Sequence, residues 1–298
     1  MKIAFVGLPL AALLLAEDGH DIVWAGICRK DALGLRRLTK RLGKARVRVV
    51  PDLAKAAVQD EVRALAPDLV VSWFWTKKIP RAFRTLAPRG ALGVHPSLLP
   101  RHRGPDPFFW AIDAGDRTTG VTAHVVEDEY DTGAILAQRE LAIDPSWNAW
   151  TLAKKLDRPS LAVLRDVVAA HARGEPPAPI AQDDTAATDA PQPSDDDLEI
   201  RWSSWDAERI ERRVRAASPW PGAFTEMFEA PLVITNVRAT KDHPRALEPG
   251  EACVREDGVA VVRAGRDAVE LLAGRLEEGE DDAGTELDEA DLAALVAS

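Results

Sequence analysis

The sequence predicts an α/β domain with a mostly parallel sheet and helices on both faces, followed by a smaller β-barrel-like domain. Residues 3–26 run in the order strand, turn, helix, strand, which is how a parallel sheet begins. Short apolar runs then alternate with helical patterns as far as residue 174. Beyond residue 222, short alternating runs separated by glycine turns are typical of a small β-barrel.

The first domain is expected over residues 1–174. Strands are predicted from short apolar runs, at residues 3–6, 22–26, 47–50, 68–72, 91–94, 120–126 and 134–141. Helices are predicted from apolar residues at helical spacing, at residues 10–16, 52–66, 79–86, 105–115 and 148–174. Asp52 is a suitable N-cap for the second helix, and Pro159 predicts an interruption of the last one.

Gly7 stands where a dinucleotide-binding fold carries its first phosphate-binding glycine. Leu8 and Pro9 follow, and the other two glycines of the G-x-G-x-x-G fingerprint are absent. We therefore expect a Rossmann-like topology without NAD. Residues 29–47 are rich in Lys and Arg, a pattern that favours a solvated helix face over a site for an anionic ligand.

Residues 175–197 are rich in Pro, Ala and Asp and have no periodicity, so they are predicted to form a linker. The second domain is expected over residues 198–298. Helices are predicted at its two ends, at residues 204–217 and 285–297. Short strands are predicted between them, at residues 224–228, 232–238, 252–255, 259–263 and 268–272.

The net charge of −10 arises in residues 198–298, which hold 12 basic and 22 acidic side chains. A protein that grips a nucleic-acid backbone needs a positive surface, so this distribution favours a small-molecule partner over tRNA. The alternative is that a local basic patch on the helix at residues 204–217 suffices, formed by Arg209, Arg212, Arg213 and Arg215.

The two cysteines, Cys28 and Cys253, are too few and too far apart to indicate a disulfide framework or a metal site. We therefore expect a cytoplasmic protein without a bound metal. The apolar N-terminal run ending at Ala16 superficially resembles a secretory signal, but Gly7 and Pro9 interrupt it and no clear cleavage site follows. The run is also too short to span a membrane.

The stretch of residues 93–133 carries the side chains that indicate chemistry. A short apolar strand leads to His95, and Pro96 begins a loop that cannot be helical. A second apolar strand, residues 120–126, leads to Asp131. Neighbouring strands of one sheet can bring the two side chains together. A carboxylate that holds one imidazole nitrogen raises the basicity of the other, as general acid-base catalysis requires.

These residues resemble the motifs of the formyltransferases that use 10-formyltetrahydrofolate. That family pairs H-x-S-L-L-P-x-x-R-G with a later D-x-G, and here the two motifs occupy residues 95–104 and 131–133. The resemblance extends to residues 110–112, 119–122 and 219–223, so it covers most of the chain. It implies a catalytic α/β domain, an open, OB-like C-terminal barrel, and formyl transfer to an amine, with methionyl-tRNA the family's best-known acceptor.

The resemblance also implies roles for individual residues. His95 would stabilise the negative charge that develops on the formyl oxygen, and Asp131 would orient the ring and take the proton of the amine. The residues implied to bind the formyl donor are Lys78, Ile79, Pro96, Glu127, Asp128, Glu129 and Tyr130. For the four acidic and polar residues of the last segment, a solvated loop is the alternative. A flat ring could also stack on residues 73–75, for which core packing is the alternative.

Gly93 departs from the family, which usually carries a catalytic Asn two residues before the His. Loss of one such donor costs on the order of 3 kcal/mol of barrier. We expect a water molecule, or the side chain of Ser97 or His124, to occupy the vacated space, although a core position is the alternative for His124. The hydrolase part of formyltetrahydrofolate dehydrogenase also lacks this Asn, and is similar over residues 95–104.

Three functions follow from these patterns. The first is formyl transfer from 10-formyltetrahydrofolate to a primary amine, with a small molecule such as an amino sugar nucleotide favoured over methionyl-tRNA. The second is hydrolysis of the same donor to formate, which Gly93 favours. The third is folate binding without catalysis, against which the intact His95 and Asp131 argue. The sequence does not indicate an oligomeric state.

Overall fold

The computed structural model of the chain describes residues 1–227, 231–276 and 284–298, which form two compact units. The first unit comprises Met1–Pro107, Thr118–Ala142 and Lys155–Pro191. The second unit comprises Phe108–Arg117, Ile143–Lys154 and Gln192–Ser298. Each unit therefore collects segments that are distant in sequence.

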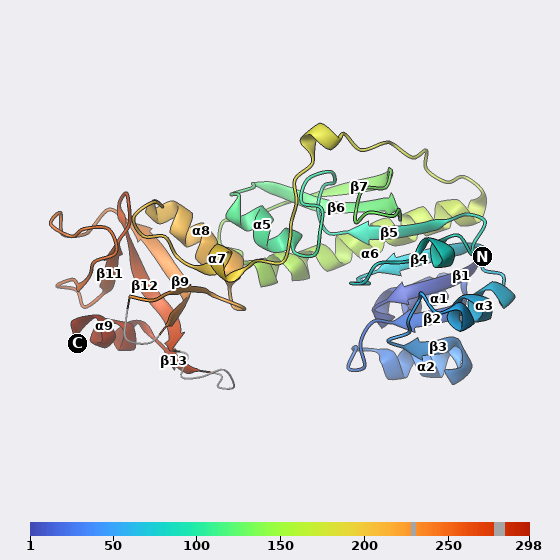
Figure 1. Ribbon diagram of the computed structural model, residues 1–298, viewed down its shortest axis with the longest axis horizontal. Coiled ribbons are helices and arrows are strands. Elements are labelled where there is room, and N and C mark those ends of the chain that lie inside the picture. Colours follow the sequence, from blue (N-terminus) through green and yellow to red (C-terminus); the bar gives the residue numbers. More distant parts are fainter. Residues whose placement is uncertain (228–230, 277–283) are drawn as a thin grey trace. The chain divides into compact units, whose positions relative to one another are not determined.

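The first unit is built on a seven-stranded sheet with the order β3-β2-β1-β4-β5-β6-β7 (Figure 1). Its strands are β1 (Lys2–Gly7), β2 (Asp21–Ile27), β3 (Val47–Val49), β4 (Leu69–Trp73), β5 (Ala91–His95), β6 (Thr118–Val125) and β7 (Ile135–Ala142). The strands from β3 to β5 pair in parallel, whereas β6 and β7 are antiparallel additions. The predicted mostly parallel sheet is confirmed, and each predicted apolar run forms one of its strands.

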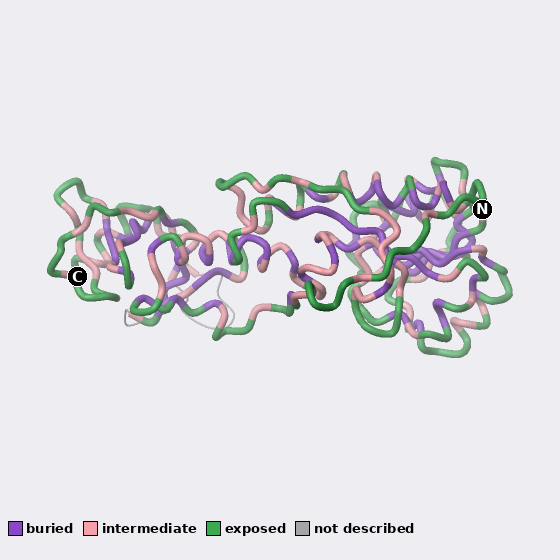
Figure 2. Tube along the Cα trace, turned by 90° about the horizontal axis from the view of Figure 1, so that it is seen from above, coloured by how far each residue is buried: buried purple, intermediate pink, exposed green. Residues whose placement is uncertain are grey.

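Helices cover both faces of this sheet, as predicted. On one face, Val62 of α3 and Phe83 of α4 pack in a core cluster with strand residues that include Val70 of β4. On the opposite face, Trp73 of β4 donates its indole N–H to Ser160 of α6 at 3.1 Å. Strands β1, β2 and β4 are buried over nearly their whole length, whereas every residue of β7 at the edge is half-buried or exposed; Figure 2 shows the burial along the trace. The helices in residues 1–174 are α1 (Pro9–Glu17), α2 (Leu35–Leu42), α3 (Ala56–Ala64), α4 (Arg81–Arg84), α5 (Pro107–Asp113) and α6 (Ala149–Arg173), and a 3-10 turn, η1, spans Lys44–Arg46.

Two helices differ from their predicted form. Asp52 does not cap α3, because its carboxylate accepts the N–H of Ala54 in a preceding turn and the helix begins later. Helix α6 runs through Pro159 without the predicted interruption. The hydroxyl of the next residue, Ser160, donates to the carbonyl of Asp157 and so satisfies a carbonyl of the same turn.

The second unit contains a six-stranded antiparallel sheet with the order β10-β11-β12-β9-β8 and with β13 beside β12 (Figure 1). Its strands are β8 (Ala223–Thr225), β9 (Leu232–Thr240), β10 (Ala252–Val254), β11 (Ala260–Arg263), β12 (Ala268–Leu276) and β13 (Thr285–Leu287). Its later helices are α7 (Asp195–Leu198), α8 (Ala207–Ala217) and α9 (Glu289–Ala297). The expected strand-rich C-terminal domain is confirmed. The end of the strand predicted at residues 224–228 lies outside the described residues.

The segment after α6, predicted from its composition to be a linker, contains a short 3-10 turn, η2 (Asp184–Ala186). Its first part belongs to the first unit as far as Pro191. There Ile180 exchanges both backbone hydrogen bonds with Ile135 of β7, at 2.7 and 2.9 Å. A part of the predicted linker therefore pairs with the edge of the main sheet. In the described part of the chain, no helix has both the length and the hydropathy needed to cross a membrane.

Candidate active site

His95 is the last residue of β5, and its side chain is 6% exposed. Its Nε2 atom lies 2.8 Å from the carbonyl oxygen of His102, and its Nδ1 atom lies 3.3 Å from Oδ2 of Asp131. A carbonyl oxygen only accepts, so Nε2 carries a proton and donates it. The ring is thus fixed by a carbonyl oxygen at one edge and faces a carboxyl group at the other.

Asp131 meets three partners at its carboxyl group. Oδ2 accepts the backbone N–H of Gly104 at 3.0 Å and contacts His95, while Oδ1 lies 3.5 Å from Nε2 of His124. The residue has a positive φ of 58°, a left-handed conformation that is uncommon outside glycine. Such a conformation persists where surrounding contacts determine it, and it clusters at functional sites. The structure therefore brings together the two side chains that the sequence predicts to meet.

The glycines of the two motifs permit close approach of backbone segments. A Cβ atom at Gly133 would overlap the carbonyl oxygen of Val125, so only glycine allows the turn after Asp131 to return to β6. A Cβ atom at Gly104 would lie 2.7 Å from the carbonyl oxygen of Ala190, and Gly104 itself has a φ of +126°. Both positions therefore require glycine for the carboxylate to be held where it is.

His124 lies on β6 directly opposite Gly93 of β5. The Nε2 atom is 3.6 Å from the point that a Cβ atom at position 93 would occupy, so the ring stands in the space beside the missing side chain. The Nδ1 atom lies 2.9 Å from the carbonyl of Val125, to which it donates a proton. Burial lowers the pKa of His124, although the charge of Asp131 opposes this shift. The ring is therefore neutral near pH 7, with the lone pair of Nε2 facing Asp131.

Ser97 is fully buried, and its hydroxyl donates to the carbonyl of Arg101 at 2.6 Å. Its own carbonyl accepts the hydroxyl proton of Thr122, which also accepts the N–H of Leu99. These bonds fix the loop after His95 onto β6. Of the two residues expected beside Gly93, the structure places His124 there and directs the Ser97 hydroxyl into its own loop.

The residues expected to bind the formyl donor come from two segments joined by ion pairs. Arg84 has a side chain that is 8% exposed, and its Nη2 atom lies 2.7 Å from Asp128 and 4.0 Å from Glu127. Lys78 lies 3.5 Å from Glu129. The hydrogen bond from Arg84 lowers the pKa of Asp128 and keeps that carboxyl group ionised. The acidic loop is therefore held against the segment that ends at α4. The remaining predicted residues are Ile79, which is buried, Pro96, which is half-buried, and Tyr130, which is 54% exposed.

The same region leaves a buried donor without a partner. The indole N–H of Trp75 is buried and, among the described residues, has no hydrogen-bond partner. A buried N–H of this kind is costly unless something accepts its proton. The preceding residue, Phe74, has a positive φ of 54°. Trp75 also packs against the buried cluster of the first unit, and Trp73 is buried with its indole N–H bonded to Ser160. The structure therefore favours core packing for these two residues over a surface on which a flat ring could stack.

Gln182, which the sequence did not single out, completes the surroundings of Asp131. Gln182 donates its amide N–H groups to the carbonyls of Asp131 and Gly133, both at 2.7 Å. Its amide oxygen accepts from Nε and Nη2 of Arg103, at 3.0 and 2.8 Å. Gln182 lies in the predicted linker, where no periodicity or motif marks it. In the described ranges, no three His, Cys, Asp or Glu side chains gather as they would around a metal ion.

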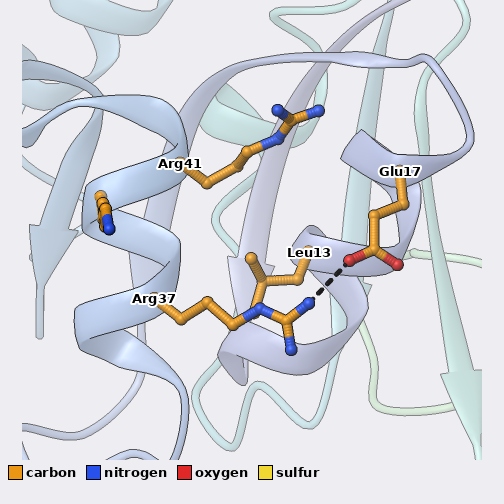
Figure 3. Close-up of a pocket in the computed structure, with 5 residues that line it drawn as sticks. Leu13, Glu17, Arg37 and Arg41 are labelled. Carbon is orange, nitrogen blue, oxygen red and sulfur yellow. Dashed lines mark hydrogen bonds and ion pairs between the residues drawn. The ribbon is translucent and has the colours of Figure 1, made fainter.

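A separate pocket lies between α1 and α2, away from these residues (Figure 3). Its lining is basic on the α2 side and includes Arg37 and Arg41, and Arg37 donates to Glu17 of α1 at 2.9 Å. The basic run predicted at residues 29–47 thus forms, in part, the exposed face of α2. The structure favours the expected solvated helix face for this part of the run.

Comparisons with known proteins agree with the motifs. A model described as Formyl transferase matches residues 38–168, and one described as Formyl transferase, C-terminal domain, matches residues 193–287. A methionyl-tRNA formyltransferase of Anaeromyxobacter sp. (strain K) is 36% identical over an alignment of 294 residues, and the match covers 93% of this chain and 93% of that protein. A methionyl-tRNA formyltransferase of Chloroflexus aurantiacus (strain ATCC 29366 / DSM 635 / J-10-fl) is 36% identical over 287 residues, with 91% of each chain covered.

Two solved structures share the fold. HypX from Aquifex aeolicus, in complex with tetrahydrofolic acid, has a TM-score of 0.67 at 20% identity. The match covers 98% of this chain and 46% of HypX, so the chain spans about half the length of that protein. An N-formyltransferase from Helicobacter canadensis, in complex with folinic acid and dTDP-3-aminofucose, has a TM-score of 0.67 at 14% identity, with 91% of this chain and 98% of that chain covered. At these identities the likeness shows the fold alone.

Proposed function

Because the chain belongs to the formyl transferase family, we propose that it transfers the formyl group of 10-formyltetrahydrofolate to a primary amine at His95 and Asp131. The observation that carries this proposal is the contact of 3.3 Å between Nδ1 of His95 and Oδ2 of Asp131 at the end of β5. When bound, the folate supplies the formyl group. Positioning and proton transfer are left to the side chains of this chain.

His95 stabilises the negative charge that develops on the formyl oxygen as the amine attacks. Its Nε2 atom contacts the carbonyl of His102 and its Nδ1 atom contacts Asp131, so one of these contacts opens when the formyl oxygen accepts a ring N–H. A preorganised donor at the developing charge lowers the barrier. Asp131 orients this ring and accepts the proton that the attacking amine must lose.

His124 takes the place of the missing amide side chain beside Gly93. Its neutral ring presents the lone pair of Nε2 to Oδ1 of Asp131 across 3.5 Å. This nitrogen can hold the proton that Asp131 takes from the amine. The proton would return to N10 of the folate when the bond between N10 and the formyl carbon breaks, so that N10 leaves as a neutral amine and the carboxylate is restored. Ser97 contributes indirectly, because its hydroxyl fixes the loop that follows His95.

The formyl donor is held by Lys78, Ile79, Pro96 and the loop of residues 127–130. The ion pairs of Arg84 and Lys78 with this loop keep the two segments together. Backbone groups of these segments can satisfy the donors and acceptors of a pterin ring.

A small-molecule amine is the proposed acceptor, with the chain in the cytoplasm. The arginines of α8, which were the alternative basic patch, are committed within the second unit. Arg213 is 4% exposed and pairs with Asp113 at 2.7 Å, and Arg209 pairs with the same carboxylate at 2.8 Å. Arg215 donates to the carbonyl of Trp147. Guanidinium groups that satisfy internal partners contribute little to binding a phosphate backbone.

Methionyl-tRNA is the second candidate acceptor. It is favoured by relatives named methionyl-tRNA formyltransferase that match 93% of this chain, including the region of the C-terminal family model. The exposed basic face of α2, which includes Arg37, Lys40 and Arg41, would then supply the phosphate contacts (Figure 3).

One assay distinguishes the candidates. The protein is incubated with 10-formyltetrahydrofolate, and the appearance of tetrahydrofolate is followed without an acceptor, with amino sugar nucleotides, and with methionyl-tRNA. Release only with an added amine supports transfer and identifies the class of acceptor. Equal release with and without an amine indicates hydrolysis instead. Absence of release in all three, or full activity of Asp131→Asn, contradicts the proposed chemistry.

A further inference from the structure

The segment of residues 180–190 crosses both loops of the site, although its composition resembles a linker. Thr188 accepts the backbone N–H of His102 at its hydroxyl, at 2.9 Å, and that of Arg103 at its carbonyl, at 2.8 Å. Ala190 in turn donates its N–H to the carbonyl of Arg103 at 2.6 Å. The segment is therefore bonded along the loop that follows His95.

Gln182 connects that loop to the turn of Asp131. Its two amide protons go to the carbonyls of Asp131 and Gly133, and its oxygen accepts two N–H groups of Arg103. A side-chain amide has two protons and two lone pairs, so its whole capacity is used here. Nη2 of Arg103 also reaches Asp184 of the same segment at 2.8 Å.

These bonds address a specific problem at Asp131. A non-glycine residue with a φ of 58° costs free energy, and the surrounding structure must hold it there. Gln182 donates hydrogen bonds to the carbonyls of Asp131 and Gly133, which are the two ends of the strained turn. A shift of about 1 Å at a reacting group can cost a hundredfold in rate.

We propose that Gln182 is a positioning residue, which ties the Asp131 turn to Arg103 so that the carboxylate stays against His95. This inference rests on the proposed formyl transfer. Partners of this kind, which orient a reacting side chain without touching substrate, typically change activity by about 10- to 100-fold at metal sites, and we expect a similar range here.

Two substitutions distinguish the hydrogen bonds of Gln182 to the Asp131 turn from those to Arg103. Gln182→Met keeps the size of the side chain and removes all four hydrogen bonds. Gln182→Glu keeps an acceptor for Arg103 and loses both protons donated to the turn. Gln59 provides a matched control, because its amide also donates to two backbone carbonyls, at 3.0 and 3.2 Å, but from α3. Gln59→Met should leave the kinetics unchanged.

We expect both Gln182 variants to lower kcat by about 10- to 100-fold, while KM for 10-formyltetrahydrofolate stays within about twofold. The ¹⁵N signal of Nδ1 of His95 should also move, because it reports the contact of this atom with Asp131. Its assignment follows from a His95→Gln spectrum. Wild-type kcat in Gln182→Glu, or an unmoved signal in either variant, overturns the proposal.

The kinetics and the ¹⁵N signal of His95 test the role of Gln182 and the proposed function independently. If the wild-type protein releases no tetrahydrofolate with any acceptor, formyl transfer is wrong, and the His95 signal alone decides for or against the link. If kcat and KM change together, and the thermal unfolding temperature falls further than in Gln59→Met, Gln182 serves stability only, which also overturns the proposal.

Discussion

Removal of the His124 ring is the most direct test of how the site works without an amide at position 93. Its Nε2 atom lies 3.5 Å from Oδ1 of Asp131 and 3.6 Å from the place of a Cβ atom at Gly93. We expect His124→Ala to lower kcat about a hundredfold, because loss of one proton-transfer or oxyanion group costs at least that much. KM for the folate should change less than about twofold, since the ring contacts Asp131 rather than the loop proposed to hold the donor.

A hundredfold loss of kcat corresponds to about 2.7 kcal/mol of barrier. The space beside Gly93 provides a control for this loss. A Cβ atom at Gly93 would meet Val126, His124 and Ser72 at 3.5, 3.6 and 3.7 Å, which are ordinary contacts. Gly93→Ala should therefore keep the wild-type rate within about twofold and serves as the control. The further atoms of an asparagine would enter the space of the imidazole, so Gly93→Asn alone should lower the rate.

The double variant connects the two positions. In His124→Ala, the space left by the ring can accept an asparagine at position 93, which would supply an amide donor. We expect Gly93→Asn in that background to raise kcat about tenfold or more, so that the two substitutions are strongly non-additive. The assay is tetrahydrofolate release with a saturating amine, measured for wild type, both single variants and the double variant.

A clear result would refute this reasoning. If His124→Ala remains folded, as judged by its urea unfolding curve, and keeps kcat within about twofold of wild type, the ring is a buried core residue and takes no part in the reaction. If Gly93→Asn alone raises the rate, the amide position is empty in the folded protein and His124 does not fill it.

Four further predictions concern the loops of the site and the protonation of His124. Arg84→Gln removes the ion pair with Asp128 and so releases the loop of residues 127–130, which should raise KM for 10-formyltetrahydrofolate about tenfold with little change in kcat. Steady-state kinetics checks this, and Arg63→Gln on α3, which loses an exposed ion pair, is the control. Burial lowers the pKa of His124, so as the pH falls below the ordinary value of 6.5 the unfolded state binds a proton before the folded state does. The free energy of unfolding should therefore be highest above pH 6.5 and decline below it. Urea unfolding of His124→Gln, measured at about pH 7 and 5, should show a smaller decline than the wild-type protein. The catalytic rate should persist through pH 6.5 and fall only at more acidic pH, where the ring gains a proton. Gly133→Ala should destabilise the protein by about 2 kcal/mol and reduce kcat, because the added Cβ atom would overlap a backbone carbonyl of β6; urea unfolding with parallel kinetics tests both effects.

The strands of the first unit could be predicted from the sequence because they are short apolar runs, and burial in a sheet covered on both faces leaves a plain pattern. In the second unit, β13 occupies residues that were predicted to begin a helix, because the helical spacing of the following residues was extended too far toward the N-terminus. The meeting of His95 and Asp131 followed from two adjacent strands and two recognisable motifs. Their roles stay predictions. The start of α3 was less predictable, because the carboxylate of Asp52 is used in a competing turn.

The position of His124 beside Gly93 could not be read from the sequence with certainty. It depends on the antiparallel register of β5 and β6, and a shift of one residue would send the ring to the opposite face. Gln182 was missed for a different reason. Its role arises from hydrogen bonds to backbone carbonyls, and composition does not reveal which carbonyls a polar side chain will reach.

The bonding of residues 180–190 also decides where this protein can be divided. A fragment that stops at residue 174, just beyond α6, would contain every motif of the first domain and yet leave the carbonyls of Asp131 and Gly133 without their amide. Limited proteolysis within this stretch should inactivate the enzyme while leaving its main sheet intact. The shortest fragment worth expressing therefore extends through Pro191.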